Sequence, residues 1–501
     1  MITERYQKQI KGILSCYDRI VVHGNVIPWG YADGMTSYLY SHNIRIFDFP
    51  QFAHPLREEV RKNAEQVARD NALTIEHIRK TKSFRKEDRI RKIIEQRGDH
   101  PGLVHIFSAM EACTTYQPWH DKKSGKTFLR PDGGQCLHYY FYFIDRELGL
   151  CYLRVPSWVP FRVQFYCNGH HWLAHRLCKK QIPFVLRENA FLSIADFPAA
   201  QKLSDQLRVK DFHQVFDLYA RMFCPVVERL GCTYHWSIMQ AEYATDILFH
   251  RQKDLTPLYE NLVRTAIHSV KPENIATFLG RKLSPLYQGE MGNTFNTRIQ
   301  GTRIKHQMGA VSLKMYDKYG IILRIETSTN DVSHLQCVRE VRHRNGQTTR
   351  KRAPMLKSIY SLYPLAKLCQ AANRRYLEYI SSFDDPSQGI THLHQVSRDV
   401  SVENRNYKGF NFFSAEDLSL FTVLCRGEFN ISGLRNKDLR HYLPWSTGKT
   451  SRMLKRLRLH GLVKRVAGSY KYYLTKLGKR VILAGFQVKE LFIVPRLAGM
   501  V

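Results

Sequence analysis

The sequence lacks the cysteine pattern, the long apolar runs and the leader that would place it in several common classes. Its eleven cysteines stand singly along 501 residues, and none forms a CxxC pair. A zinc ribbon or a disulfide framework is therefore not expected, and we interpret the thiols as reduced and mostly buried. No apolar run approaches the roughly 20 residues that span a bilayer, and residues 1–10 have no apolar signal-peptide core. A cytoplasmic protein is expected.

Acidic residues are also scarce relative to basic ones. Lys and Arg number 76 against 44 Asp and Glu, which gives a formal net charge of +32. Such an excess destabilises a compact chain by self-repulsion unless a polyanion relieves it. The sequence has no long basic amphipathic helix with a Trp/Leu face, so no membrane partner is expected. Nucleic acid is the expected partner; DNA is favoured by the motifs below, and RNA stays possible.

Hydrophobic periodicity and turn signals predict an α+β protein with several domains. Residues 1–130 form an N-terminal α/β region with a basic helix. Residues 131–380 are rich in strand-like segments and predict a central α+β domain with an antiparallel sheet, which is the candidate catalytic domain. Residues 381–413, rich in Asp, Ser, Asn and Gly, are interpreted as a linker. A last domain is predicted at 414–485.

The last domain has the element order of a winged helix. Helices are predicted after an N-cap at Ser414, at 436–442 and at 449–460, and the run LVKRVAGSYKYYLT at 462–475 is typical of a hairpin. The string SRMLKRLRLHGLVKRVAGSYKYYLTKLGKRV, which begins at Ser451, resembles the recognition helix and wing of bacterial regulators of the multiple-antibiotic-resistance-repressor type. The resemblance implies a winged-helix domain that binds DNA.

In such a domain the third helix enters the major groove and the hairpin contacts the flanking backbone. From Arg435 to Arg480 there is one acid, Asp438, among fourteen Lys or Arg. A winged helix used for protein contacts is an alternative, but it would not need such one-sided charge. The predicted DNA-binding residues are Lys449, Arg452, Lys455, Arg456, Arg458, Lys464, Arg465 and Lys471.

Two strings in the central domain carry charged residues within strand-like surroundings. MQAEYATDILF, at 239–249, places Glu242 and Asp246 on one face of a strand. Acids on an otherwise buried strand are unfavourable without a metal or a basic partner. VSLKMYDKYGIILRIETSTND, at 311–331, places a tyrosine in one strand and Glu326 in the strand that returns.

This arrangement is similar to rolling-circle replication initiators and conjugative relaxases whose site uses acids in place of a histidine pair. The resemblance implies that Tyr316 is a nucleophile that forms a phosphotyrosyl bond with DNA and that Lys318 neutralises the developing charge. It also implies a divalent metal, Mg²⁺ or Mn²⁺, held by Glu242, Asp246 and Glu326. The implied function is metal-dependent nicking and joining of DNA by a protein of a mobile element, plasmid or phage.

Other interpretations stay open. The strand acids could be neutralised by nearby Arg303, Lys305 and Arg324 and be structural only. A non-enzymatic winged-helix regulator or another nucleic-acid-binding protein would then be the better description. A metal-dependent transposase or recombinase could instead use scattered acids, for which the candidates are Asp18, Asp48, Glu111 and Asp246. The oligomeric state and the DNA target are not indicated by the sequence.

Two further motifs have weaker meanings. His171 and His175 have an HxxxH spacing beside His170, which could bind zinc, but Trp172 stands where a zinc protease has glutamate. The basic segment RHRNGQTTRKR, at 342–352, is interpreted as a solvated loop or a phosphate contact.

The charge balance makes a first prediction. Because phosphate neutralisation and counterion release would dominate binding, the affinity of the full chain for duplex DNA should fall by about 10³-fold or more between roughly 50 and 200 mM salt. Fluorescence anisotropy of a labelled duplex, titrated at several salt concentrations, measures this. A salt-independent affinity would contradict the interpretation that a polyanion is the partner.

Overall fold

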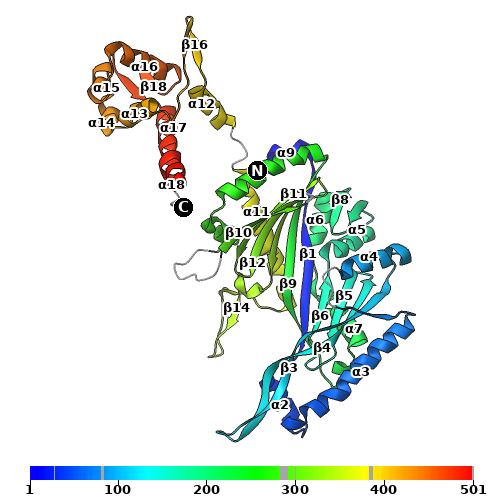
Figure 1. Cartoon of the computed structure of the whole chain (residues 1–501). Helices are drawn as coiled ribbons and strands as arrows, with labels where there is room; N and C mark the ends of the chain where they lie inside the picture. The colour runs from blue at the N-terminus through cyan, green and yellow to red at the C-terminus, as the bar shows by residue number, and fades with distance from the viewer. Residues whose placement is uncertain (28, 80–83, 282–290, 299–300, 383–386, 499–501) are drawn as a thin grey trace. The chain divides into compact units, whose positions relative to one another are not determined.

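The fold is described from a computed structural model of the chain, which describes residues 1–27, 29–79, 84–281, 291–298, 301–382 and 387–498. The chain divides into two compact units, Met1–Asp384 and Asp385–Val501, and each has a hydrophobic core of its own (Figure 1). Helices and strands are mixed, so the predicted α+β class is confirmed. No described helix is both long enough and apolar enough to cross a bilayer.

The first unit is built on one 11-stranded sheet. Its strands are β1 (Ile10–Val26), β2 (Ile75–His77), β3 (Gly102–Asp121), β4 (Lys126–Asp145), β5 (Gly149–Pro156), β6 (Val163–Cys167), β9 (Tyr234–Phe249), β10 (Met291–Arg298), β11 (Gly301–Met308), β12 (Val311–Lys318) and β13 (Ile322–Thr329). The spatial order is β10-β11-β12-β13-β9-β1-β6-β5-β4-β3-β2, and neighbours are antiparallel except for β2 with β3. The predicted antiparallel central sheet is therefore present.

Two strands that are far apart in the sequence meet at the centre of this sheet. β1 pairs along nearly its whole length with β9, so that Arg19 lies opposite Glu242 and Leu14 opposite Asp246. The sequence predicts separate regions at 1–130 and 131–380, whereas the sheet joins them in one unit. This pairing links segments more than 200 residues apart, and local sequence patterns carry no signal for it.

Helices pack on both faces of the sheet. Those that matter here are α3 (Phe49–Asp70), α4 (Lys86–Arg97), α5 (Gly169–Lys179), α7 (Val209–Phe223) and α11 (Leu362–Ser381). Asn373 of α11 donates to the Tyr243 carbonyl and accepts from the Thr327 hydroxyl, which places α11 over β9 and β13. Because side chains alternate along a strand, Glu242 and Glu326 point to the face opposite α11.

The second unit begins before the predicted winged helix. Residues 381–413 are predicted as a linker, but they contain α12 (Ser387–Ser397) and a hairpin of β16 (Val400–Val402) and β17 (Arg405–Tyr407). Val396 and Phe410 are buried in the core of this unit, so the segment belongs to it. There follow α13 (Ala415–Leu424), α14 (Gly427–Ser432), α15 (Asn436–Tyr442), α16 (Thr447–Leu459), β18 (Val463–Arg465), β19 (Tyr472–Leu474), α17 (Lys476–Gln487), η5 (Val488–Ile493) and α18 (Val494–Leu497).

The burial of Val396 and Phe410 predicts where an independent fragment must begin. A fragment of residues 387–498 should unfold cooperatively, whereas a fragment of 414–485 should be about 3–6 kcal/mol less stable, since each of these two apolar side chains contributes about 1.5–3 kcal/mol. Urea denaturation followed by circular dichroism measures the difference. As a control, a fragment of 387–487 should keep its stability, because Val488 and Leu491 beyond it are exposed. Equal stability of all three fragments would contradict this assignment.

Candidate functional site

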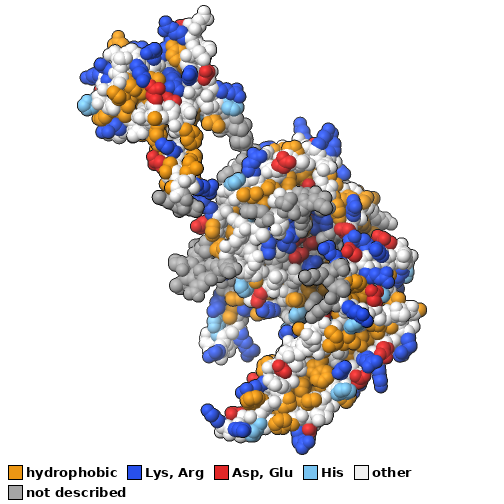
Figure 2. Space-filling view, in the orientation of Figure 1, with side chains coloured by type: hydrophobic (Ala, Val, Ile, Leu, Met, Phe, Trp, Pro, Cys, Tyr) orange, Lys and Arg blue, Asp and Glu red, His pale blue; other side chains and the backbone are white. Residues whose placement is uncertain are grey.

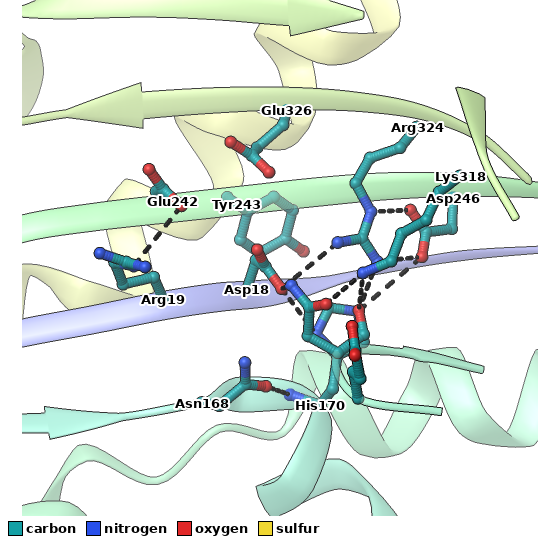
Figure 3. A network of polar contacts seen from close by, with 12 residues as sticks. Asp18, Arg19, Asn168, His170, Glu242, Tyr243, Asp246, Lys318, Arg324 and Glu326 are labelled. Atoms are coloured by element: carbon teal, nitrogen blue, oxygen red, sulfur yellow. Dashed lines mark hydrogen bonds and ion pairs between the residues drawn. The ribbon is translucent and has the colours of Figure 1, made fainter. Parts of the chain in front are cut away.

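A cluster of charged side chains lies on the face of the sheet that is opposite α11 (Figure 3). Four neighbouring strands supply it. The alternation of side chains along β9, β12 and β13 places every second residue on this face, and the register sets Lys314 opposite Glu326 and Tyr316 opposite Arg324. The contributing residues are Asp18 of β1, Glu242 and Asp246 of β9, Lys314, Tyr316 and Lys318 of β12, and Arg324 and Glu326 of β13.

Three of these acids converge. One carboxylate oxygen each from Asp18, Glu242 and Glu326 lies within 4.8 Å of the others, and these form the one such group of potential metal ligands found in the described part of the chain. Oxygen atoms of carboxylates are the ligands that Mg²⁺ and Mn²⁺ prefer. The donor set therefore fits the predicted class of metal, with Asp18 in place of Asp246.

Lys314 balances part of this negative charge. Its Nζ donates to Glu326 Oε1 at 2.6 Å and to Glu242 Oε1 at 3.1 Å. Arg19 lies on the other side of Glu242, with Nε 3.7 Å from Oε2. A cation bound by the acids would share them with Lys314, whose ammonium already neutralises part of their charge.

Tyr316 joins the cluster through Glu326. Its phenolic hydroxyl donates to Glu326 Oε2 at 2.9 Å. Burial, together with the charge of Glu326, raises the pKa of Tyr316 well above its usual value. Burial also raises the pKa of Glu326, against the opposing effect of Lys314. The tyrosine is therefore protonated at neutral pH, and the carboxylate that would take its proton is in direct contact with it.

Asp246 belongs to a second group, which is centred on Arg324. The guanidinium of Arg324 is fully buried and donates through Nε and Nη2 to the two oxygens of Asp246, both at 2.6 Å. Although burial opposes it, the charge of Arg324 lowers the pKa of Asp246 to about 2. The predicted role of Asp246 as a metal ligand is therefore corrected, because its oxygens are occupied by a bidentate ion pair.

Asp18 connects the two groups. Its Oδ1 lies 3.3 Å from Nη1 of Arg324 and 3.2 Å from Nδ1 of His170, which stands in the first turn of α5. His170 Nε2 lies 3.8 Å from Asp246 on its other side. Figure 3 shows Asp18 between the Glu242–Glu326 side and the Arg324–Asp246 side. The imidazole and the guanidinium thus fix the position of Asp18.

Lys318 has its contacts with Asn189. Its Nζ contacts the side chain of Asn189 and lies 3.4 Å from the Asn189 carbonyl. Burial, assisted by the charge of Arg324, lowers the pKa of Lys318 to about 8. Its predicted role in neutralising charge on a phosphate stays a prediction, and Lys314 is the lysine that contacts Glu326, the partner of Tyr316.

The alternative constellations do not converge on one point. Asp48 pairs with Arg45, and Glu111 pairs with Arg154, so neither joins Asp18 at the site. The three histidines have separate partners: His170 faces Asp18, His171 bonds the Glu188 carbonyl, and His175 lies 3.4 Å from Glu147. The structure therefore gives no support to a zinc site there or to a four-acid transposase site.

In the second unit most predicted DNA-binding residues are accessible. Arg452 and Arg458 on α16, and Lys464 and Arg465 in the hairpin, are exposed; Lys471 is half-buried. Two others have acidic neighbours. Lys449 pairs with Glu416 at 2.5 Å, and Lys455 lies 3.5 Å from Glu403.

Arg456 is the exception, and the prediction that it binds DNA is corrected. Its guanidinium bonds both oxygens of Asp417, at 2.8 and 3.0 Å, and also the carbonyls of Lys408 and Gly409. The side chain is only 13% exposed. Asp417 is buried, so Arg456 neutralises it and holds the segment before α13 against α16, which leaves it unable to reach DNA.

Sequence reasoning also misses two residues of the site. It finds Asp18 only as a member of a scattered acid set, and it does not single out Lys314. A signal for Lys314 exists, because this lysine shares one face of β12 with Tyr316. The role of Asp18 depends on the pairing of β1 with β9, which the local pattern does not contain.

Comparisons with known proteins do not identify a family for this chain. No family model matches the chain, and no curated protein matches it in sequence. Among solved structures, a rolling circle replication initiator protein from Geobacillus stearothermophilus is similar at 8% sequence identity, over 64% of this chain and 75% of that one, with a TM-score of 0.19. A TM-score of this size does not establish a common fold, so the interpretation of the site depends on its own geometry.

The buried ion pair of Arg324 makes a stability prediction. Arg324→Met should lower the free energy of unfolding by about 3–5 kcal/mol, because it leaves Asp246 and Asp18 charged and buried without their partner. Thermal unfolding of the full chain, followed by circular dichroism, measures the change. Arg19→Met is the matched control: its side chain is 47% exposed, so a much smaller effect is expected.

The pH dependence tests the same pair. Because the pKa of Asp246 is lowered in the folded chain, its contribution to stability is present above about pH 4 and is lost as the pH falls toward 2. The difference between the Arg324→Met chain and the parent should therefore shrink in acid. A difference that does not change with pH, or a Met variant as stable as the parent, would show that the pair is not ionised.

Proposed function

We propose that this chain is a DNA-binding protein that nicks and rejoins DNA strands through Tyr316, as a replication initiator of a mobile element, plasmid or phage does. The observation that carries the proposal is the contact of the Tyr316 hydroxyl with Glu326, one of three acids whose oxygens lie within 4.8 Å of each other. A nucleophile, an acceptor for its proton and ligands for a cation are thus in one place, which is what transfer of a phosphoryl group to a tyrosine requires.

The chain's own residues account for the proton transfer. The phenolic oxygen of Tyr316 forms a bond with phosphorus, while the bond from that phosphorus to one ester oxygen of the strand breaks. Glu326 takes the phenolic proton, to which it is already hydrogen-bonded, and its raised pKa makes it a better base. Water protonates the departing oxygen, which becomes a free hydroxyl end. Rejoining follows the same steps in reverse.

The acids have a second task. Asp18, Glu242 and Glu326 would hold Mg²⁺ or Mn²⁺, which when bound neutralises charge on the phosphate. Lys314 contacts Glu242 and Glu326, and Arg19 contacts Glu242, so these acids are held in position without it. Arg324 and His170 hold Asp18 in place, so the geometry of the cluster is set before DNA binds.

The second unit would select the DNA. Its order of helices followed by a hairpin and a further helix supports the proposed winged-helix domain, with α16 as the recognition helix. The exposed side chains of Arg452 and Arg458 would reach the major groove, and Lys464 and Arg465 the adjacent backbone. Arg456 takes no part in this, since it is paired with Asp417.

A second function is favoured by one observation. The acid triad is complete without the tyrosine, so a metal-dependent transposase or recombinase that activates water at Asp18, Glu242 and Glu326 is also chemically reasonable. The two functions differ in the product. Attack by tyrosine leaves protein bound covalently to one DNA end, whereas attack by water leaves both ends free.

The covalent step gives the central prediction. Tyr316→Phe removes only a hydroxyl, so the chain should fold and bind DNA as before, while nicking of supercoiled plasmid in Mg²⁺ or Mn²⁺ should fall by about 10²-fold or more. The parent chain should form a protein–oligonucleotide adduct that survives denaturing electrophoresis, and the variant should not. Tyr319→Phe is the matched control, because the Tyr319 hydroxyl bonds Glu188 outside the acid cluster.

Glu326→Gln separates the remaining outcomes. It should abolish nicking by both mechanisms, because it removes a proton acceptor and a metal ligand. If Tyr316→Phe nicks normally and Glu326→Gln does not, the transposase-like function is correct. If the parent chain nicks no plasmid with either metal, the acids are structural and the chain is a non-enzymatic DNA-binding protein.

A further inference from the structure

A strongly basic ribbon of two strands follows the last strand of the site and has no role in the proposed chemistry. β14 (Gln336–Arg342) and β15 (Thr348–Pro354) pair antiparallel and form a separate two-stranded sheet. Figure 1 shows them standing away from the large sheet, and Figure 2 shows Lys and Arg side chains at that place. Residues 336–354 contain six Lys or Arg and a single acid, Glu340. The ribbon includes the basic segment 342–352, for which the sequence predicts a loop or a phosphate contact.

Most residues of the ribbon are exposed to solvent. Residues 348–352 of β15 are all exposed, so they are accessible on both faces of the ribbon. Every second residue of β14 is also exposed, including Val338, Glu340 and Arg342. Burial returns only at Ala353, close to the body of the unit. Hydrophobic burial therefore does not explain why this segment forms paired strands that project into solvent.

The cations of the ribbon have no acidic partner among the residues that the structure describes. Arg339 donates to the carbonyls of Pro354 and Glu340, and Arg352 donates to the carbonyl of Gly280, so these two fix the base of the ribbon. No acid of the described residues lies within ion-pair distance of any of the six cations, which are Arg339, Arg342, Arg344, Arg350, Lys351 and Arg352.

The surface of α3, where basic and acidic residues are equal in number, shows the difference. On α3, Arg57 and Arg61 lie close to Glu58, and Arg61 also bonds Glu65 at 3.0 Å. That pattern is typical of a solvated helix face on which acidic and basic side chains three or four residues apart pair with one another. Six neighbouring cations beside one acid repel one another, and a partner of opposite charge removes the repulsion.

The shape of the ribbon fits duplex DNA. Seven residues in each strand give a length of about 23 Å at roughly 3.3 Å per residue, and a two-stranded ribbon fits in the major groove, which is about 12 Å wide. Arg side chains on such a ribbon reach guanine edges from its face and phosphates from its sides. We infer that the β14–β15 ribbon binds duplex DNA in the major groove.

This inference rests on the proposed DNA-binding function and adds a second contact to it. The ribbon starts seven residues after β13, the strand that carries Arg324 and Glu326, and both lie in the same compact unit. A duplex held by the ribbon is therefore held by the unit that contains Tyr316. The contact is independent of the second unit and of α16.

The test uses the full chain with Tyr316→Phe, so that binding is measured without nicking. A triple variant, R342A/R344A/R350A, is compared with R57A/R61A/R69A on α3, which removes the same charge from another exposed surface. On a duplex of about 30 base pairs, the slope of log affinity against log salt should fall by about 0.9 for each phosphate that the variant no longer neutralises, or about 2–3 for the ribbon variant. The α3 variant should keep the slope of the parent.

Because the substituted side chains are exposed, thermal unfolding should be unchanged. If the triple variant is less stable than the parent, R342Q/R350Q replaces it.

Two measurements decide whether the groove is entered. The Tyr316→Phe chain with an intact ribbon, which is the parent in this test, should protect guanine N7 atoms from methylation by dimethyl sulfate. These atoms face the major groove, so the ribbon variant should protect them less. Duplex RNA of the same length should bind the two chains about equally, because side chains cannot enter its deep and narrow major groove. An equal weakening on DNA and RNA duplexes would overturn the groove contact.

The outcomes separate this inference from the proposed function. R452A/R458A on α16 reports on the second unit alone. If that pair weakens duplex binding and the ribbon variant does not, the ribbon inference is wrong and the DNA-binding proposal stands. If the parent itself does not bind duplex DNA, both are wrong. Equal slopes for the ribbon and α3 variants would also overturn the inference.

Discussion

The site depends on the buried guanidinium of Arg324. A fully buried arginine in the middle of a sheet is stable only if its charge is balanced, and here Asp246 and Asp18 balance it, while Nε and Nη2 donate to Asp246 and to the Asn189 carbonyl. One consequence is that Asp246 is not available to a metal. Another is that Asp18 is held at the edge of the ion pair, where it also faces Glu242 and Glu326. The position of Asp18, the third acid of the cluster, is thus set by an ion pair that joins β9 and β13.

The division of the acids into two groups follows from this constraint. Asp246 makes two short hydrogen bonds to one guanidinium, whereas Glu242 and Glu326 share the ammonium of Lys314, and Glu242 also lies 3.7 Å from Arg19. An ammonium is a point charge that can move with its flexible stem, while a guanidinium in a bidentate pair is fixed. The bidentate pair therefore fixes the orientation of Asp246 more strictly than the shared ammonium fixes those of Glu242 and Glu326. The hydroxyl of Tyr316 lies on the Glu242–Glu326 side, where it donates to Glu326.

The parts of this site that the sequence predicts are those within one hairpin. Tyr316 and Glu326 lie on β12 and β13, which are joined by a short turn, and their contact follows from alternation and register alone. The same is true of the order of helices and hairpin after residue 414. Asp18 could not be predicted, because it depends on the pairing of β1 with a strand more than 200 residues later. The assignment of Arg456 to DNA is wrong for a similar reason: on a helical wheel it is one more cation of α16, and only the fold brings Asp417 and Gly409 against it.

The error at Arg456 bears on how the net charge of +32 is understood. Each Lys or Arg adds one positive charge to the formal net charge whether or not an acid pairs with it. Only a cation without an acidic partner is available to bind a polyanion. Arg324 and Arg456 pair with buried acids inside the chain, and Arg61 pairs with Glu65 on its surface. By contrast, Arg342, Arg344 and Arg350 stand on an exposed ribbon with a single acid among them. Among the described residues, the cations without an acidic neighbour include those of the ribbon in the first unit and Arg452, Arg458, Lys464 and Arg465 in the second. Net charge alone therefore does not identify the cations that a polyanion could meet, because the fold decides which of them are already paired.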